Sequence, residues 1–165
     1  MNPIVKSGLV AALVALIADQ ASKLWLLFVF DIRARGSVEV TPFFDLVLHW
    51  NKGISYGWFQ AETPAAQALL LALKLVAVVA LSIWLWKAHN RITAVGLGLI
   101  IGGAIGNGID AITLGAVMDF ALFHLQWGDK RFDWYVFNVA DVAIVAGVAG
   151  LLYDSVLGVP AAKAP

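Results

Sequence analysis

The sequence contains no cysteine. It can therefore form no disulfide and offers no thiolate metal ligand and no thiol nucleophile. Charged residues are also scarce, at 13% of the 165 residues, and the 11 basic and 11 acidic side chains cancel. Because no basic run is present, nothing supports an electrostatic surface for nucleic acid. These absences exclude thiol-dependent enzymes and predict no nucleic-acid partner.

Hydrophobic residues, in contrast, make up 61% of the chain. The mean hydropathy is +0.85, far from the roughly half-apolar, quarter-charged balance of soluble domains. This composition indicates an integral membrane protein.

Four apolar stretches are long enough to cross a bilayer at about 20 residues per crossing. We place these spans at about 8–30, 65–86, 92–112 and 138–157. The first begins like a secretory signal, but its hydrophobicity resumes beyond Lys23, so we expect a retained span. The predicted fold class is membrane α-helical, a four-transmembrane-helix bundle forming one integral membrane domain over 1–165.

The longest polar stretch lies between the first two spans. Apolar and polar residues alternate over 45–51, which is the period of a half-buried strand. Nearby Trp50, Tyr56, Trp58 and Phe59 are aromatic side chains of the kind found at membrane–water boundaries. We predict a small surface β-sheet over about 36–60. The segment 121–136 mixes aromatic and charged residues and is interpreted only as a second boundary segment.

Four spans place both termini and the connection 87–91 on one side of the membrane, and the sheet on the other. Lysines and arginines outside the spans do not orient the chain clearly. The termini side carries its basic residues in shorter segments, where the positive-inside rule applies best.

Small and polar residues follow helical spacing within the spans. Gly98, Gly102 and Gly106 recur every four residues, which clears one face of the third span for close helix packing. Asn107 and Asp110 are three residues apart and point the same way.

Three charged side chains lie inside the first two predicted spans. Asp19 and Lys23 are four residues apart, so they share a helix face as a pair that either locks the bundle or supports a site. For Lys74 we favour snorkelling, or pairing with an acid of the bundle, over a functional role.

Two carboxylates stand at matching ends of neighbouring spans. Asp119 follows the third span and Asp141 begins the fourth, so antiparallel packing brings both to one membrane depth. Two carboxyl groups held close in a low dielectric keep one proton between them. An aspartyl peptidase uses such a pair to activate water and to protonate the leaving nitrogen. The positive end of the fourth helix favours the ionised state for Asp141.

A purely structural interpretation remains open at this point. Asn138 and Asp141 suit the N-cap and third positions of a helix, and Asp119 suits a surface anchor. Other chemistries have less support, because the three histidines lie in different segments and no zinc-peptidase, serine-elbow or phosphate-loop motif is present.

Four sequence blocks resemble one known family. They are NKGISYGWF (51–59), GGAIGNGID (102–110), GAVMDF (115–120) and FNVAD (137–141). Together they are similar to the blocks of the bacterial lipoprotein signal peptidases, signal peptidase II, in order along nearly the whole chain.

The resemblance implies a multi-pass aspartyl endopeptidase of the bacterial inner membrane. It implies an active site near the periplasmic face, cytoplasmic termini and a periplasmic sheet. The implied substrate is a prolipoprotein cut just before its diacylglyceryl-modified cysteine. The implied partners also include membrane lipids and a globomycin-type peptide inhibitor, with no metal or organic cofactor.

Asp119 and Asp141 match the family's catalytic pair. The other implied site residues, which bind substrate or support the pair, are Asn51, Gly53, Asn107, Asp110, Asn138, Ala140, Asp19 and Lys23.

The chain departs from the family pattern at two positions. Ala111 stands where an arginine is usual, and Val142 where a small hydroxyl residue is usual. These departures leave open an inactive, lipid-binding relative. A small proton- or ion-coupled transporter subunit using the intramembrane charges is a further alternative, although no inverted repeat is visible.

Overall fold

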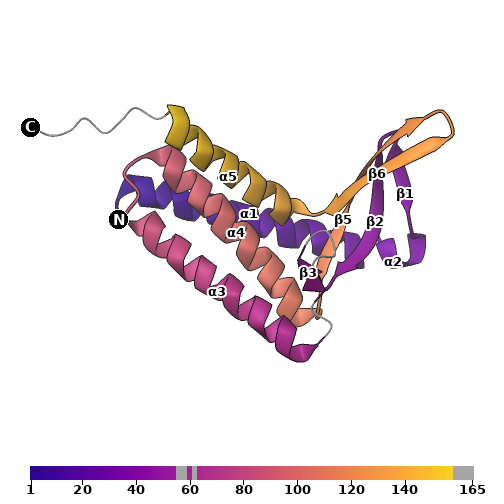
Figure 1. The fold of residues 1–165 in the computed structure, drawn as a ribbon, viewed down its shortest axis with the longest axis horizontal. Helices are drawn as coiled ribbons and strands as arrows, with labels where there is room; N and C mark the ends of the chain where they lie inside the picture. The colour runs from indigo at the N-terminus through magenta and orange to yellow at the C-terminus, as the bar shows by residue number, and fades with distance from the viewer. Residues whose placement is uncertain (55–58, 61–62, 158–165) are drawn as a thin grey trace, which may run out of the picture.

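The computed structural model describes residues 1–54, 59–60 and 63–157. Four helices in it are long and apolar enough to cross a membrane, which confirms the predicted fold class. They are α1 (Pro3–Phe28), α3 (Pro64–Trp86), α4 (Arg91–Thr113) and α5 (Val139–Leu157). Figure 1 shows these helices as one bundle, with the strands gathered at the end where α4 ends and α5 begins.

Polar caps fix where three of these helices begin. The side chains of Asn2, Thr63 and Asn90 each accept a hydrogen bond from a backbone N–H in the first turn that follows. These bonds satisfy donors that have no partner inside the helix. Pro64 lies in the first turn of α3, where its missing N–H costs nothing.

The glycine repeat brings α4 against α1. A Cβ atom added to Gly98 would meet the backbone of Gly8, and one added to Gly102 would meet the backbone of Ala12. Helix α4 also contacts α5 and α3, so it is the central helix of the bundle. The predicted close packing of the third span is confirmed, and the two helix backbones approach too closely for any side chain between them.

The four-stranded sheet is antiparallel, in the order β1-β2-β5-β6. Its strands are β1 (Val38–Thr41), β2 (Phe44–Asn51), β5 (Val117–Trp127) and β6 (Lys130–Phe137). A separate two-stranded sheet pairs β3 (Gly53–Ile54) with β4 (Phe59–Gln60), and a short helix, α2 (Ile32–Arg35), precedes β1.

The sheet predicted over about 36–60 is present in that range, but it extends beyond it. Half of the four-stranded sheet comes from the hairpin β5–β6, in the segment we had interpreted only as a boundary. Aromatic and aliphatic residues alternate there with polar ones, and Gly128 takes the positive φ of 59° that the turn requires. Of the predicted boundary aromatics, Tyr56 and Trp58 lie outside the described residues.

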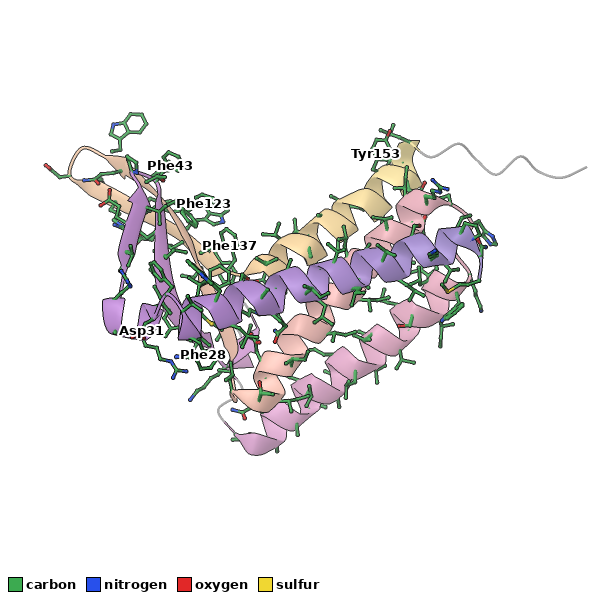
Figure 2. The ribbon with its side chains drawn as sticks, turned by 180° about the vertical axis from the view of Figure 1, so that it is seen from behind. Phe28, Asp31, Phe43, Phe123, Phe137 and Tyr153 are labelled. Atoms are coloured by element: carbon green, nitrogen blue, oxygen red, sulfur yellow. The ribbon has the colours of Figure 1, made fainter. Side chains whose placement is uncertain are left out.

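One face of the β5–β6 hairpin is apolar and exposed. It carries Phe123, Leu125, Phe132 and Trp134, with Leu125 and Phe132 directly paired across the strands. In Figure 2, Phe43 and Phe123 lie on the side of the sheet that faces the helices. An apolar face at this level is typical of contact with the membrane boundary.

An ion-paired cluster centres on buried Asp45. Its Oδ1 lies 3.0 Å from His124 Nε2, and its Oδ2 accepts a hydrogen bond from Arg131 at 2.8 Å. Burial acts to raise the pKa of Asp45, but the hydrogen bonds from Arg131 and His124 outweigh it and lower that pKa. This cluster ties β2 to both strands of the hairpin.

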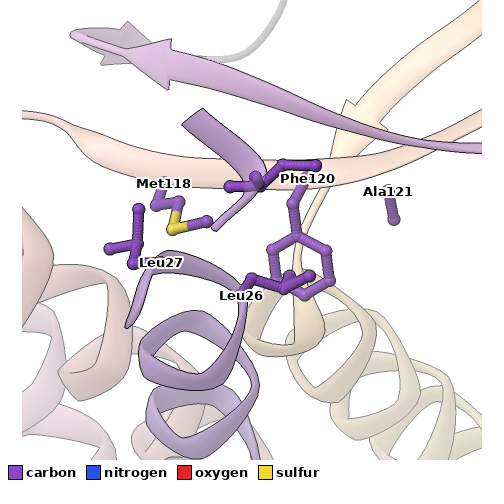
Figure 3. Packing of buried hydrophobic residues seen from close by; sticks show 6 residues of the cluster. Leu26, Leu27, Met118, Phe120 and Ala121 are labelled. Carbon is purple, nitrogen blue, oxygen red and sulfur yellow. The ribbon is translucent and has the colours of Figure 1, made fainter. Parts of the chain in front are cut away.

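A small hydrophobic core joins the end of α1 to β5. Figure 3 shows the close packing of Leu26 and Leu27 beneath Met118 and Phe120. Because successive side chains of a strand point to opposite faces, burying residues 118 and 120 in this core turns Asp119 to the other face. The core therefore positions the first of the two predicted catalytic carboxylates.

Candidate functional site

Asp119 lies in β5 with only 2% of its surface exposed. Its Oδ1 accepts a hydrogen bond from Asn138 Nδ2 at 2.7 Å, and its Oδ2 accepts one from Asn51 Nδ2 at 3.1 Å. Asn51 stands at the end of β2, in a strand paired with β5. Both carboxylate oxygens of Asp119 are thus held by side-chain amides from separate elements.

Asp141 lies in the first turn of α5. Its Oδ2 accepts a hydrogen bond from the Asn138 backbone N–H at 3.1 Å, while its own N–H donates to Asn138 Oδ1 at 2.9 Å. This reciprocal pair is a helix capping box. Asp141 Oδ1 also accepts a bond from Asn107 Nδ2 at 3.1 Å. The helix-cap interpretation of Asn138 and Asp141 is therefore confirmed as local geometry.

The cap and the predicted carboxylate pair prove to be parts of one arrangement. Asn138 contacts Asp119 through its side-chain amide and Asp141 through its backbone N–H. A single residue thus joins the two carboxylates that the sequence placed at matching ends of neighbouring spans.

Burial raises the pKa of Asp119 to about 7. The hydrogen bond from Asn51 opposes this shift, while the negative charge of Asp141 adds to it. Asp119 therefore keeps its proton to a much higher pH than an ordinary aspartate, whose pKa is near 4. A pair in which one carboxyl group holds a proton near neutral pH can act as acid and base together.

A buried charge cluster lies beneath the pair. Lys23 Nζ stands 2.8 Å from Asp19 Oδ2 and 2.7 Å from Asp110 Oδ2. It also donates to Asn107 Oδ1 at 3.1 Å. The predicted pairing of Asp19 with Lys23 is confirmed, and so is the shared direction of Asn107 and Asp110. The sequence did not reveal that one lysine serves both helices.

Each carboxylate of this cluster also fixes a backbone segment next to the pair. Asp19 Oδ1 accepts a hydrogen bond from the Ala140 N–H at 2.9 Å, one residue before Asp141. Asp110 Oδ2 accepts one from the Met118 N–H at 3.1 Å, one residue before Asp119. The cluster thus sets the position of both β5 and the start of α5.

Gln20 is a site residue that sequence reasoning missed. Its Nε2 atom lies 3.0 Å from Asp110 Oδ1 and 3.2 Å from both Asp19 Oδ2 and the Gly106 carbonyl oxygen. A polar amide directly after Asp19 in an apolar span was the available signal. Gly106 also has no room for a side chain, because an added Cβ would lie 2.5 Å from Asp19 Oδ2.

Of the predicted site residues, Gly53 alone has no place among these side-chain contacts. Its backbone pairs with that of Gln60 in the two-stranded sheet, two residues after Asn51. The departures from the family pattern lie at the edge of the site. Val142 is 54% exposed, and Ala111 lines a cleft between α3 and the end of α4.

That cleft has a volume of about 240 Å³ and reaches Asn51, the amide that contacts Asp119. One wall carries Gln67, Leu71 and Lys74 of α3. The cleft therefore brings α3 side chains into one space with the amide that holds Asp119. Within residues 1–54, 59–60 and 63–157, no group of three or more acidic, histidine or cysteine side chains is placed to hold a metal ion.

Comparison with known proteins decides the family. Residues 11–157 match the family model described as signal peptidase (SPase) II. The chain belongs to the signal peptidase II family. It is therefore a peptidase and a multi-span membrane protein, and the transporter interpretation is not supported.

Curated relatives agree along the full length. The chain is 66% identical to the lipoprotein signal peptidase of Nitrobacter hamburgensis over 165 residues, covering 100% of both chains. It is 60% identical to that of Rhodopseudomonas palustris, strain CGA009, with the same coverage. A lipoprotein signal peptidase of Beijerinckia indica is 53% identical, over 98% of this chain and 96% of its own.

Two solved structures share the fold. Both are described as bacterial membrane enzymes determined by the in meso method. The 2.3 Å structure has a TM-score of 0.72 at 23% identity and covers 97% of this chain and 95% of its own. The 1.9 Å structure has a TM-score of 0.73 at 24% identity, with 92% and 93% coverage. The arrangement of bundle and sheet is thus shared with enzymes of low sequence identity.

Proposed function

We propose that this peptidase is of the aspartic type, with Asp119 and Asp141 as its catalytic pair. The observation that carries the proposal is that Asn138 bonds both carboxylates, one in a strand and one at a helix start. The substrate is a prolipoprotein, cut on the N-terminal side of its diacylglyceryl-modified cysteine.

The two carboxylates take different roles. Asp119, with its pKa raised to about 7, holds the proton and polarises the scissile carbonyl. Asp141, at the positive end of α5, is the ionised partner that accepts a proton from the attacking water. The water oxygen bonds to the carbonyl carbon, and the carbonyl oxygen takes the proton from Asp119. The resulting gem-diol intermediate then collapses. Its C–N bond breaks, the leaving nitrogen takes a proton from Asp141, and a hydroxyl group of the gem-diol returns a proton to Asp119.

The asparagines keep the pair in this state. Asn51 donates to Oδ2 of Asp119, and Asn107 donates to Oδ1 of Asp141. These bonds limit rotation of both carboxyl groups. Lys23, bound to Asp19 and Asp110, holds the backbone beneath them. Gly53 and Ala140 contribute backbone, Gly53 beside the substrate and Ala140 through its N–H to Asp19.

The site lies at a membrane boundary, as a lipid-bearing peptide requires. We place the enzyme in the bacterial inner membrane, with the sheet and the pair near the periplasmic face. An even number of spanning helices supports both termini on one side of the membrane, which we assign to the cytoplasm. Membrane lipids surround the bundle, and a globomycin-type cyclic peptide inhibits by occupying the substrate position.

Cleavage of a diacylglyceryl-modified prolipoprotein by the purified protein in detergent tests this function. We expect Asp119→Asn and Asp141→Asn each to lower kcat by at least about a hundredfold, the range of general acid–base catalysis. Asp129→Asn, at the exposed hairpin turn, is the matched control and keeps full activity. Full activity in both site variants excludes the pair, and an inactive parent protein identifies the chain as the non-catalytic relative that Ala111 and Val142 suggest.

A further inference from the structure

Lys74 is a cation inside a membrane-spanning helix that the catalytic arrangement does not use. It lies ten residues after Pro64 in α3, which corresponds to about 15 Å along the helix axis. An unpaired ammonium group at such a depth is costly, so its neighbours should show what offsets the cost.

The predicted pairing of Lys74 with an acid of the bundle is not found. Among the residues that the structure describes, its ammonium makes no ion pair, and every acid near the bundle centre is bonded to another group. Asp19 and Asp110 are held by Lys23, and Asp141 is held by Asn138 and Asn107.

Lys74 instead lines the cleft of about 240 Å³ that ends at Asn51. Its helical neighbours on this wall, Gln67, Leu70 and Leu71, lie three to seven residues before it and so share its face. Helical side chains lean toward the N-terminus of their helix, which is the Asn51 end of the cleft. The α4 residue that lines the cleft is Ala111, whose small side chain leaves room for a ligand beside the ammonium group.

The chemistry of the cleft selects the ligand. Among residues 1–54, 59–60 and 63–157, its lining combines apolar side chains with cationic or amide donors and contains no acidic residue. It therefore fits a group that is apolar along its length and carries oxygen acceptors near one end. An acyl ester has this character, since its carbonyl oxygen accepts a hydrogen bond while its chain stays in the hydrocarbon region.

We propose that Lys74 recognises the lipid of the substrate by donating a hydrogen bond to an ester carbonyl oxygen of the diacylglyceryl group. This inference rests on the proposed function, because the lipidated cysteine follows the scissile bond and must lie beside the carboxylate pair. The cleft links Lys74 to the carboxylate pair, because Lys74 and Asn51 both line it and Asn51 contacts Asp119. Lys74 is thus a specificity-determining residue, and it takes no part in proton transfer.

Binding of two synthetic lipopeptides to the full chain tests this inference without cleavage. One carries the natural diacylglyceryl cysteine, and the other carries a dialkylglyceryl cysteine whose ether oxygens replace the esters. Both are measured in the Asp119→Asn background in detergent. We expect the ester peptide to bind about tenfold more tightly, the effect of one hydrogen bond to a charged group.

Lys74→Met keeps the length of the side chain and removes its charge. Methionine is tolerated in a membrane-spanning helix, so this variant folds, and we expect it to bind ester and ether peptides equally. Lys74→Arg restores the preference for the ester. Lys52→Met removes the same charge from an exposed residue of the same cleft and leaves the preference intact.

The inference is overturned if Lys74→Met keeps the tenfold preference, if Lys52→Met abolishes it instead, or if the parent background shows none. Each of these outcomes is independent of catalysis. The proposed function fails separately, if Asp119→Asn still cleaves the ester peptide or if the unsubstituted protein does not.

Discussion

The Ala140 N–H donates to Asp19 Oδ1 at 2.9 Å, and this bond ties the first helix to the residue before Asp141. The same aspartate uses its other oxygen to pair with Lys23. A charge buried in the first span therefore sets the start of the last. Stability and site geometry are coupled at this point.

Lys23→Met tests that coupling. The substitution leaves Asp19 and Asp110 as buried carboxylates without a counter-charge, and breaking a buried pair in this way costs about 3–5 kcal/mol. We expect a large fall in the unfolding temperature in detergent. Lys6→Met, on the exposed side of the same helix, is the control and unfolds like the parent. Adding Asp110→Asn to Lys23→Met removes one unpaired charge and recovers part of the loss, whereas unchanged unfolding of the single variant contradicts the argument.

The raised pKa of Asp119 predicts an alkaline limit to activity. The protonated form is needed as the acid, so kcat/KM, which follows ionisation of the free enzyme, falls as pH rises through about 7. The proton also favours folding, because the native pKa lies above the unfolded value near 4. That contribution is complete below pH 4 and is lost as pH rises through about 7. A pH–rate profile that stays flat to pH 9 contradicts this assignment.

We expect Asn51→Leu to shift the alkaline limit of activity. The Asn51 hydrogen bond lowers the pKa of Asp119, so its removal raises that pKa and shifts the alkaline limb of the pH–rate profile to higher pH. A change in rate without a shift of the limb indicates that Asn51 acts only on substrate. A shift to lower pH contradicts the electrostatic argument.

Close approach of two helices predicts a position-specific effect within α4. Gly102→Ala places a methyl group against the backbone of Ala12 and separates α1 from α4, so we expect marked destabilisation in thermal unfolding. Gly108→Ala is the matched control, because nothing lies within 4 Å of its added Cβ. Alanine is favoured over glycine within a helix by about 1 kcal/mol, so the control is neutral or slightly stabilised. Equal effects at the two positions argue against the packing interpretation.

The Asp45 cluster predicts how the sheet responds to acid. Since the pKa of Asp45 is lowered, its contribution to stability is present above its unfolded value near 4 and is lost as pH falls below that. Asp45→Asn weakens the bonds to His124 and Arg131 and should cost about 1–3 kcal/mol at neutral pH. The fluorescence of the hairpin tryptophans reports the loss. Asp129→Asn, at the turn, leaves the acid transition unchanged.

The helices could be predicted from the sequence because the length of an apolar stretch is a local property. The predicted spans overlap all four helices, and the strand expected at 45–51 corresponds to β2 (Phe44–Asn51). The glycine repeat and the Asp19–Lys23 spacing also act within one helix, so their consequences could be derived. The family resemblance then indicated which acids matter.

Contacts between distant segments could not be derived in the same way. The hairpin β5–β6 pairs with β2 across some 70 residues, and its alternation was hidden by charged residues among the aromatics. The link from Lys23 to Asp110 and the position of Gln20 depend on how α1 and α4 are rotated about their axes. That rotation follows from the glycine contacts, whose partners on α1 only the three-dimensional structure reveals.

The Asn138→Ala variant tests whether Asn138 orients the Asp119 carboxyl group or binds the substrate. The substitution removes the side-chain bond to Asp119 and the acceptor of the Asp141 N–H, but leaves the backbone bond to Asp141 Oδ2. Loss of a cap costs about 1 kcal/mol of stability, which the folded protein tolerates. The Asp119 carboxyl then rotates more freely, so we expect kcat to fall at least tenfold while KM for the lipidated substrate stays within about twofold. Asn90→Ala removes a comparable cap at the far end of α4 and should leave kcat unchanged. If Asn138→Ala instead raises KM at constant kcat, then Asn138 binds substrate and does not orient Asp119.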